Sequence, residues 1–174
     1  LLDRVAKDMG QQCYEVPVGF KYISAKMAET NAVIGGESSG GLAVRGHIAG
    51  KDGIYAAALL VEMLAVTGKS VSQLYREITD KYGMLYYEDA AFTMTQARKV
   101  ELQEKLFVKL EVPDFGNAVE KINRTDGCKV YFTDGSWVIC RFSGTEPLLR
   151  MAAEGESQSQ ARTYIRIWRE ELGL

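Results

Sequence analysis

The stretch that decides the fold is Arg141-Phe-Ser-Gly-Thr-Glu-Pro147, a polar segment between two apolar runs. The run before it is Trp137-Val-Ile-Cys140, and the run after it is Leu148-Leu-Arg-Met-Ala-Ala153. Short apolar runs bounded by turn-forming residues are typical of β-strands. The sequence therefore predicts two strands joined by a loop that is rich in hydrogen-bonding groups.

The side chains of this loop suit the binding of a phosphate group. Arg141 offers a planar fork of donors for bidentate contact with an oxyanion. Ser143 and Thr145 add hydroxyls, and Gly144 lets backbone N–H groups approach an anion closely. An ordinary hairpin loop whose hydroxyls bond their own backbone explains the same composition equally well. It is not a Walker loop, because the pattern GxxxxGK[ST] occurs nowhere in the chain.

The surroundings of this loop predict an antiparallel sheet. Two more strand-like runs precede it, at Val119–Asn123 and Lys129–Phe132, with a turn after each. Met84–Met94 is expected to be extended, Thr95 to cap a helix that reaches about Lys109, and Ser157 to begin a last helix. We expect an α+β domain with helices on one face of the sheet.

The first half of the chain has a different pattern. Apolar spacing and capping residues predict helices at Tyr22–Thr30, at Gly53–Thr67 after a cap at Asp52, and from Ser70 to Gly83 with a Ser70/Gln73 capping box. Strands are expected at Cys13–Val18 and Ala32–Gly36. This alternation favours a parallel three-layer α/β domain, in which the apolar Gly53–Thr67 helix is covered on most sides. We place the two domains at residues 1–88 and 89–174.

Composition limits the possible functions. The 174 residues are 47% hydrophobic and 25% charged, and the net charge of −2 with no basic block argues against broad nucleic-acid binding. No apolar run approaches the roughly 20 residues that a membrane span needs. Cys13, Cys128 and Cys140 have no metal-ligand spacing, so we expect reduced thiols and a cytoplasmic location. One histidine and no CxxC pattern argue against a protein-built zinc site.

A second loop, Gly35-Gly-Glu-Ser-Ser-Gly-Gly41, directly follows a predicted strand. The ends of strands are where α/β folds place their ligands. Glu37 and Ser39 lie two residues apart and would point the same way in an extended loop, able to bind neighbouring sugar hydroxyls. A glycine turn with incidental polarity is the alternative, and composition alone favours it.

Two further side chains are candidates for proton transfer. Lys21 follows the end of a predicted strand and could act as an acid or base if desolvation lowered its pKa. His47 is the single histidine of the chain and lies just before a predicted helix start. A surface lysine and a structural histidine are the more common cases.

Four segments together resemble a known family, the α-D-phosphohexomutases, which are phosphoglucomutases and phosphomannomutases. They are VGFKYI at Val18–Ile23, GGESSGG at Gly35–Gly41, HIAGKDG at His47–Gly53, and RFSGTEP at Arg141–Pro147. Their order and spacing match the third and fourth domains of that family over nearly the whole chain. The resemblance implies an N-terminally truncated α/β domain followed by a TATA-binding-protein-like domain with an antiparallel sheet.

The resemblance also implies a reaction and roles. The family interconverts hexose 1-phosphates and 6-phosphates through a phosphoserine enzyme and a bisphosphorylated sugar. Arg141, Ser143, Gly144 and Thr145 would hold the non-reacting phosphate. Sugar hydroxyls would be bound by Glu37 and Ser39, and Lys21 and His47 would be the acid/base candidates.

The implied cofactors are Mg²⁺, bound by a domain not present in this chain, and a hexose 1,6-bisphosphate. Leu1 lies inside a predicted helix with no cap before it, so we expect a fragment whose partners are a phosphohexose and the missing N-terminal domains of the same protein. The phosphoserine and Mg²⁺ loops of the family are absent, so this chain alone is expected to be inactive. Phe20 and Gly41 stand where mannose- and glucosamine-type members commonly have histidine.

Two alternatives remain open at this point. The chain could be a non-catalytic phosphosugar-binding module that never had the other domains. It could also be an interaction module that docks through the apolar helix at Tyr55–Val66, although a core helix is the simpler interpretation of that segment.

Overall fold

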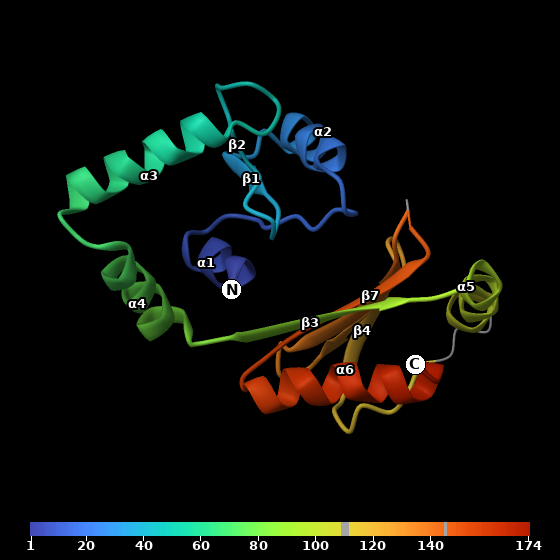
Figure 1. Cartoon of the computed structure of the whole chain (residues 1–174). Helices are drawn as coiled ribbons and strands as arrows, with labels where there is room; N and C mark the ends of the chain where they lie inside the picture. Colours follow the sequence, from blue (N-terminus) through green and yellow to red (C-terminus); the bar gives the residue numbers. More distant parts are fainter. Residues whose placement is uncertain (109–111, 145) are drawn as a thin grey trace. The chain divides into compact units, whose positions relative to one another are not determined.

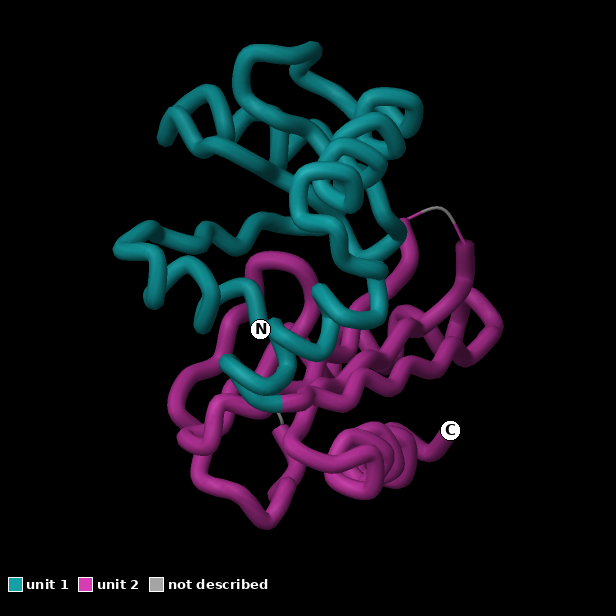
Figure 2. The backbone as a smooth tube through the Cα atoms, turned by 90° about the vertical axis from the view of Figure 1, so that its left-hand side faces the viewer, with its two compact units in different colours: residues 1–83 teal, residues 84–174 magenta. Residues whose placement is uncertain are grey.

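The computed structural model describes residues 1–108, 112–144 and 146–174 (Figure 1). The chain forms two compact units, Leu1–Gly83 and Met84–Leu174 (Figure 2). The boundary that we placed between residues 88 and 89 falls inside β3 (Tyr86–Thr93).

A five-stranded antiparallel sheet organises the second unit, in the order β3-β7-β6-β5-β4. The other strands are β4 (Val119–Asn123), β5 (Cys128–Phe132), β6 (Trp137–Phe142) and β7 (Leu148–Gly155). The two runs around the loop at residues 141–147 pair as predicted, and the extended segment after Met84 becomes the edge strand beside β7.

Helices pack against one face of this sheet. They are α5 (Gln96–Gln103), which continues as the π-helical turn η1 (Glu104–Val108), and α6 (Gln158–Leu172). The caps at Thr95 and Ser157 are confirmed, because each hydroxyl accepts from a backbone N–H three residues later. The expected end of the first helix at Lys109 lies outside the described residues.

The core of the second unit lies between α6 and the sheet. Val130, Val138 and Trp168 are fully buried, and the alternating burial of β5 and β6 assigns one face of the sheet to this core. Each fully buried apolar side chain of this size stabilises the fold by roughly 1.5–3 kcal/mol. Cys128 and Cys140 face each other across β5 and β6 as buried free thiols, and burial raises the pKa of both.

The first unit contains four helices and two short strands within residues 1–83. They are α1 (Leu2–Asp8), α2 (Phe20–Thr30), β1 (Ile34–Gly36), β2 (Leu42–Val44), α3 (Gly53–Thr67) and α4 (Val71–Tyr82). The α/β and α+β classes are confirmed, but the expectation of parallel strands is wrong for this structure. The turn after β1 reverses the chain, so β1 and β2 pair antiparallel, and Cys13–Val18 is not a strand. Parallel strands need a long crossover connection between them, and Cys13–Val18 would also need a neighbouring strand with which to pair.

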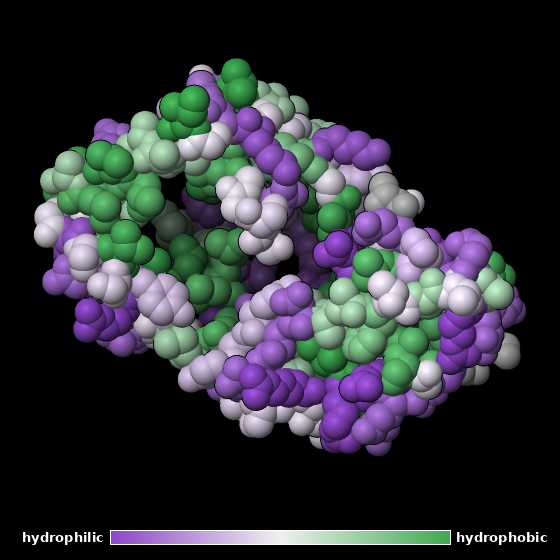
Figure 3. Space-filling model, viewed as in Figure 1, coloured by the Kyte–Doolittle hydropathy of each residue, from purple (hydrophilic) through white to green (hydrophobic). Residues whose placement is uncertain are grey.

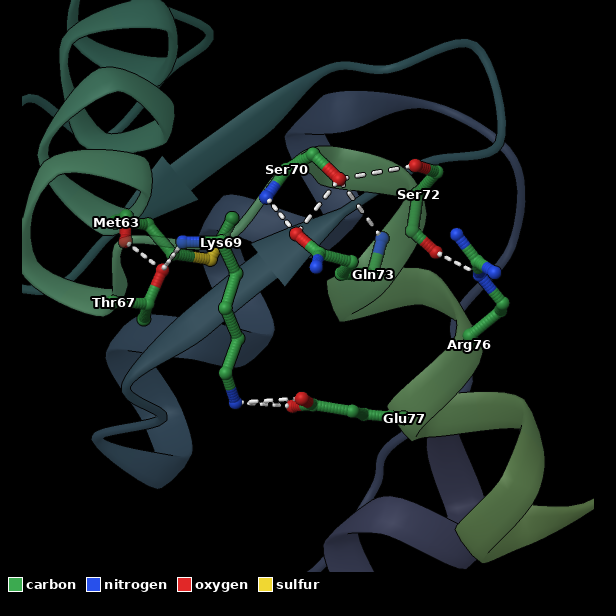
Figure 4. A network of polar contacts seen from close by, with 8 residues as sticks. All are labelled: Met63, Thr67, Lys69, Ser70, Ser72, Gln73, Arg76 and Glu77. Carbon is green, nitrogen blue, oxygen red and sulfur yellow. Dashed lines mark hydrogen bonds and ion pairs between the residues drawn. The ribbon is translucent and has the colours of Figure 1, made fainter.

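Helix α4 begins as the sequence predicts (Figure 4). The Ser70 backbone N–H donates to Gln73 Oε1 over 2.8 Å, and the Gln73 N–H donates back to Ser70 Oγ over 3.3 Å. An ion pair of 2.6 Å between Lys69 and Glu77 links the residue before the N-cap to the helix itself. These contacts satisfy donors at the helix start that have no partner within the helix.

Helix α3 differs from its predicted environment. None of its residues is buried, and Ile54 and Val66 are more than three-quarters exposed. Apolar atoms are seen over this helix in Figure 3. The expected cover on most sides is therefore not supplied by residues 1–83, where only Ile23 and Ala43 are buried apolar residues. Among the described residues, no single helix is long and apolar enough to span a bilayer. Helices α3 and α4 taken together would be, by length and composition alone, but they are bent by 81° relative to each other.

Candidate functional site

The turn between β1 and β2 brings Glu37 and Ser39 together. The Glu37 backbone N–H donates to Gly41 O over 3.0 Å, and the Gly40 N–H donates to Glu37 O over 2.9 Å. Gly40 has φ of +91°, a conformation that favours glycine. Within this turn Ser39 Oγ donates to Glu37 Oε1 over 2.9 Å. The two residues that the sequence suggested for sugar hydroxyls are thus direct neighbours.

A lysine that we did not select from the sequence joins this pair. Lys51 Nζ forms an ion pair with Glu37 Oε1 and lies 5.3 Å from the centroid of the Phe20 ring. The hydrogen bond from Lys51, and after it that from Ser39, holds the pKa of the Glu37 carboxyl below its usual value. The sequence feature that could have pointed to Lys51 is the charged segment before α3. Only the fold shows that this lysine reaches the β1–β2 turn.

His47 is held by the first turn of α3. Its Nε2 lies 2.8 Å from Asp52 Oδ2, and its ring stacks on Tyr55 with centroids 4.1 Å apart and planes at 21°. Asp52 Oδ1 also accepts from the N–H groups of Ile54 and Tyr55, each over 3.0 Å, and so caps α3. The bond from His47, followed by that from the Tyr55 backbone, lowers the pKa of the Asp52 carboxyl. One carboxylate therefore fixes both the helix start and the imidazole.

Lys21 is not joined to these groups. Its Nζ lies 4.9 Å from the centroid of the neighbouring Tyr22 ring. Within the described part of the chain it has neither a hydrogen bond nor an ion pair, so the structure gives it no link to Glu37 or His47.

At the second loop, Arg141 in β6 lies directly opposite Arg150 in β7. The neighbouring pair, Cys140 and Met151, is buried, so both arginines lie on the face of the sheet away from the core. Like charges directly opposite each other destabilise a strand pair. Within residues 1–108, 112–144 and 146–174, neither guanidinium has a hydrogen bond or an ion pair. Arg150 was missed in the sequence because its apolar neighbours suggested only a strand.

The backbone after Arg141 is fixed by its neighbours. The Ser143 N–H donates to Leu148 O over 2.8 Å, and Ser143 O accepts from Lys99 Nζ over 3.0 Å. Ser143 is buried, whereas a Cβ at Gly144 would meet no atom within 4 Å. The loop therefore has an anchored start and an open backbone position. Thr145 lies outside the described residues.

Two models of one family match the chain. The α/β/α domain III of phosphoglucomutase/phosphomannomutase matches residues 1–82, and the C-terminal domain of the same family matches residues 94–167. The chain belongs to the phosphoglucomutase/phosphomannomutase family. Both the family and the domain order that the four sequence segments indicated are confirmed.

Individual relatives agree with this assignment. The chain is 35% identical to a phosphoglucomutase/phosphomannomutase of Thermococcus kodakarensis, over all of this chain and 35% of that protein. It is 30% identical to a probable phosphoglucosamine mutase of Methanopyrus kandleri, over 93% of this chain and 34% of that protein. The crystal structure of a putative phosphomannomutase from Thermus thermophilus superposes with a TM-score of 0.74 at 26% identity, covering 99% of this chain and 34% of the other. The chain thus spans about a third of the length of these relatives.

Among the described residues there is no group of three or more His, Cys, Asp or Glu side chains that could hold a metal ion. Each unit therefore has a candidate site of its own. In the first unit it is the Glu37–Ser39–Lys51 cluster with the His47–Asp52 pair. In the second unit it is the Arg141–Arg150 pair at the start of the loop.

Proposed function

We propose that this chain is the sugar- and phosphate-binding C-terminal part of an enzyme that interconverts hexose 1-phosphates and hexose 6-phosphates. The reaction passes through a phosphoserine on the enzyme and a bisphosphorylated sugar. The observation that carries the proposal is the pairing of Arg141 with Arg150 beside the RFSGTEP loop. Two guanidinium groups placed opposite each other without carboxylate partners among the described residues form a site for an anion.

A phosphate group fits this position chemically. It accepts bidentate hydrogen bonds from each guanidinium and removes their mutual repulsion. Each hydrogen bond between charged groups contributes roughly 1.5–3 kcal/mol. Ser143, Gly144 and Thr145 supply the remaining donors, from hydroxyls and from the open backbone at Gly144. The phosphate group bound here is the one that does not react. It positions the sugar, and its bond to the sugar stays intact.

The Glu37 cluster suits the sugar ring. Glu37 accepts hydrogen bonds, Lys51 donates them and Ser39 can do both, so neighbouring hydroxyls can be bound whichever direction their protons point. This mixed character allows the two orientations that a 1,6-bisphosphorylated intermediate must adopt in turn.

Proton transfer is assigned to His47 and Lys21, with different support. The Nε2 atom of His47 is occupied by Asp52, so Nδ1 is the atom available to exchange a proton. Lys21 rests on the resemblance alone. Lys51 lies beside the sugar-binding carboxylate and is a third candidate.

Mg²⁺, a hexose 1,6-bisphosphate and the N-terminal domains of the same protein complete the proposed system. Magnesium would neutralise charge on the transferring phosphoryl group. The described residues of this chain include no group of three or more His, Cys, Asp or Glu side chains that would hold that ion. We expect this chain by itself to lack mutase activity.

The test uses the complete protein that carries this chain. A coupled assay should detect conversion of glucose 1-phosphate or mannose 1-phosphate to the 6-phosphate, and Arg141→Ala with Arg150→Ala should raise KM. Phosphosugar binding without turnover would favour the alternative, a non-catalytic phosphosugar-binding module. Absence of binding would contradict both.

A further inference from the structure

Lys99, in the first turn of α5, contacts the RFSGTEP loop from outside it. Its Nζ atom donates to the Ser143 carbonyl oxygen over 3.0 Å, although the two residues are 44 positions apart in the chain. The same ammonium lies 5.9 Å from the centroid of the Phe142 ring, within the range of a cation–π interaction. That ring packs edge-on against Phe107 of η1. Two contacts therefore hold the half-buried Lys99 at the start of the loop.

The hydrogen bond from Lys99 sets the direction of the peptide group between Ser143 and Gly144. Phe142 packs against the core, so Lys99 lies on the helix-covered side of the sheet, opposite to the face that carries Arg141. A trans peptide group is planar, and its carbonyl and its N–H point in opposite directions. Because the Ser143 carbonyl points to Lys99, the Gly144 N–H points away from α5, toward the face that carries Arg141.

The Gly144 N–H is open to a ligand. Within residues 1–108, 112–144 and 146–174 it has no hydrogen-bond partner, and a Cβ at this residue would meet no atom within 4 Å. Hydrogen bonds in a chain polarise one another, so a cation bound to the carbonyl makes the N–H of the same peptide group a stronger donor. Lys99 forms no ion pair with a described carboxylate, so its charge also adds to the positive potential at the loop.

We propose that Lys99 is a positioning residue for the phosphate site: it holds the Ser143 carbonyl so that the Gly144 N–H donates to the phosphate group beside Arg141. The inference rests on the proposed function, because it assumes that this loop binds a phosphosugar. It adds a residue of α5 that the composition of the loop does not indicate. Without Lys99 the peptide group must be ordered when the ligand binds, and this ordering weakens the affinity.

The first experiment measures the steady-state kinetics of the complete protein that carries this chain, with glucose 1-phosphate as the substrate. Lys99→Met removes the donor and the charge but keeps an unbranched side chain, whereas Lys99→Arg keeps both. Lys105→Met is the matched control. Lys105 also donates to a backbone carbonyl, that of Glu171, over 2.7 Å, but this bond joins η1 to α6 and not to the loop.

We expect Lys99→Met to raise KM about two- to tenfold, the effect of one hydrogen bond, with kcat nearly unchanged because the phosphate group bound here does not react. Lys99→Arg should recover most of this loss, and Lys105→Met should keep the wild-type KM. A lysine with a merely structural role would instead lower the fraction of active protein, and so kcat, at an unchanged KM. An unchanged KM in Lys99→Met, or an equal rise in Lys99→Arg or Lys105→Met, would overturn the proposal.

A second measurement on the same protein needs no ligand. Labelling with ¹³C at the serine carbonyls and ¹⁵N at the glycines selects the signals of Ser–Gly peptide groups, and the Ser143–Gly144 signal is the one that Gly144→Ala removes. Its carbonyl shift should move in Lys99→Met and stay in place in Lys105→Met. A carbonyl shift that does not respond to Lys99→Met would refute the positioning role.

Failure of the proposed function would look different. In that case the wild-type protein would show no turnover, and glucose 6-phosphate would not shift the Gly144 amide signal. The Ser143 carbonyl shift would still respond to Lys99→Met, because the hydrogen bond from Lys99 does not depend on a ligand. That combination would remove the phosphate site, and with it the role of Lys99 in binding, while the contact itself remained.

Discussion

Arg141 of β6 and Arg150 of β7 are direct cross-strand partners on the face of the sheet away from the core, and neither has an ion-pair partner in the described chain. Two like charges in register cost stability in the absence of a ligand. An arrangement that is unfavourable alone and favourable with an anion is typical of a binding site. A mutation of either arginine should therefore affect the stability of the free chain and the affinity for a ligand differently.

Arg150→Gln should move these two quantities in opposite directions. The free chain should gain roughly a few tenths of a kcal/mol in unfolding free energy, because a like-charge pair is removed. Phosphosugar binding should weaken by roughly 1.5–3 kcal/mol, because charge-assisted hydrogen bonds are lost. Urea unfolding and ligand titration measure the two effects. Arg166→Gln, which breaks an exposed pair with Glu170 on α6, is the control and should leave binding unchanged.

Gly127→Ala should destabilise the second unit and disturb Arg141. Gly127 has φ of +86°, and a Cβ there would lie 2.5 Å from both Cys140 O and Arg141 Cβ. The left-handed conformation alone costs a residue with a side chain roughly 1–2 kcal/mol, and the backbone contact adds to this. Chemical denaturation should show the loss. Gly144→Ala is the matched comparison, since it has open space, and equal losses in both variants would contradict the steric explanation.

Asp52→Asn should make the first unit less sensitive to acid. The pKa of Asp52 is lowered in the folded chain, chiefly by His47, so its contribution to stability is present above the unfolded value and is lost as pH falls through the folded value. The loss should therefore begin near about pH 4, the ordinary value for aspartate, and continue below it. Asparagine keeps the helix cap but carries no titrating charge. The difference in unfolding free energy between the wild-type protein and Asp52→Asn should shrink from neutral to acidic pH. If both proteins lose the same unfolding free energy on acidification, Asp52 is not the source of the acid sensitivity.

Tyr164→Phe should weaken the link between α6 and the β5–β6 hairpin. The buried hydroxyl of Tyr164 accepts from Asn117 Nδ2 and Gln160 Nε2, and it lies 3.0 Å from Ser136 Oγ. Removing it takes away one hydrogen-bond partner from each of these groups, which all keep a bond to Asp134, so we expect a loss of about 1 kcal/mol. Thermal and urea unfolding measure this loss. Tyr86→Phe on the edge strand removes an exposed hydroxyl and should change stability little.

Much of the second unit could be predicted from the sequence. The strands around the RFSGTEP loop are short apolar runs bounded by turn-forming residues, and tight turns fix which strands are neighbours. The caps at Thr95 and Ser157 and the capping box at Ser70 were also predicted, because each is formed by residues within three positions. The side chains of the RFSGTEP loop, by contrast, remain a proposed phosphate site.

The first unit was less predictable. Helices α3 and α4 begin where local signals place them, whereas α2 begins at Phe20 and not at Tyr22. The expected strand at Cys13–Val18 and the cover over α3 require contacts with other strands and layers. Hydrophobic periodicity shows that a segment is apolar on a face, not what lies against that face.

The sequence by itself determined the family, the two classes of architecture, the helix starts and the antiparallel order of β5, β6 and β7. The family follows from the four sequence segments, and the structural features depend on interactions between residues close in the chain. Only the tertiary structure decided that Lys51 meets Glu37 over Gly41, that His47 is held by Asp52 against Tyr55, and that Arg150 faces Arg141. Such contacts depend on register, on the space beside one glycine and on how a turn brings an element back, and spacing along the chain does not specify them.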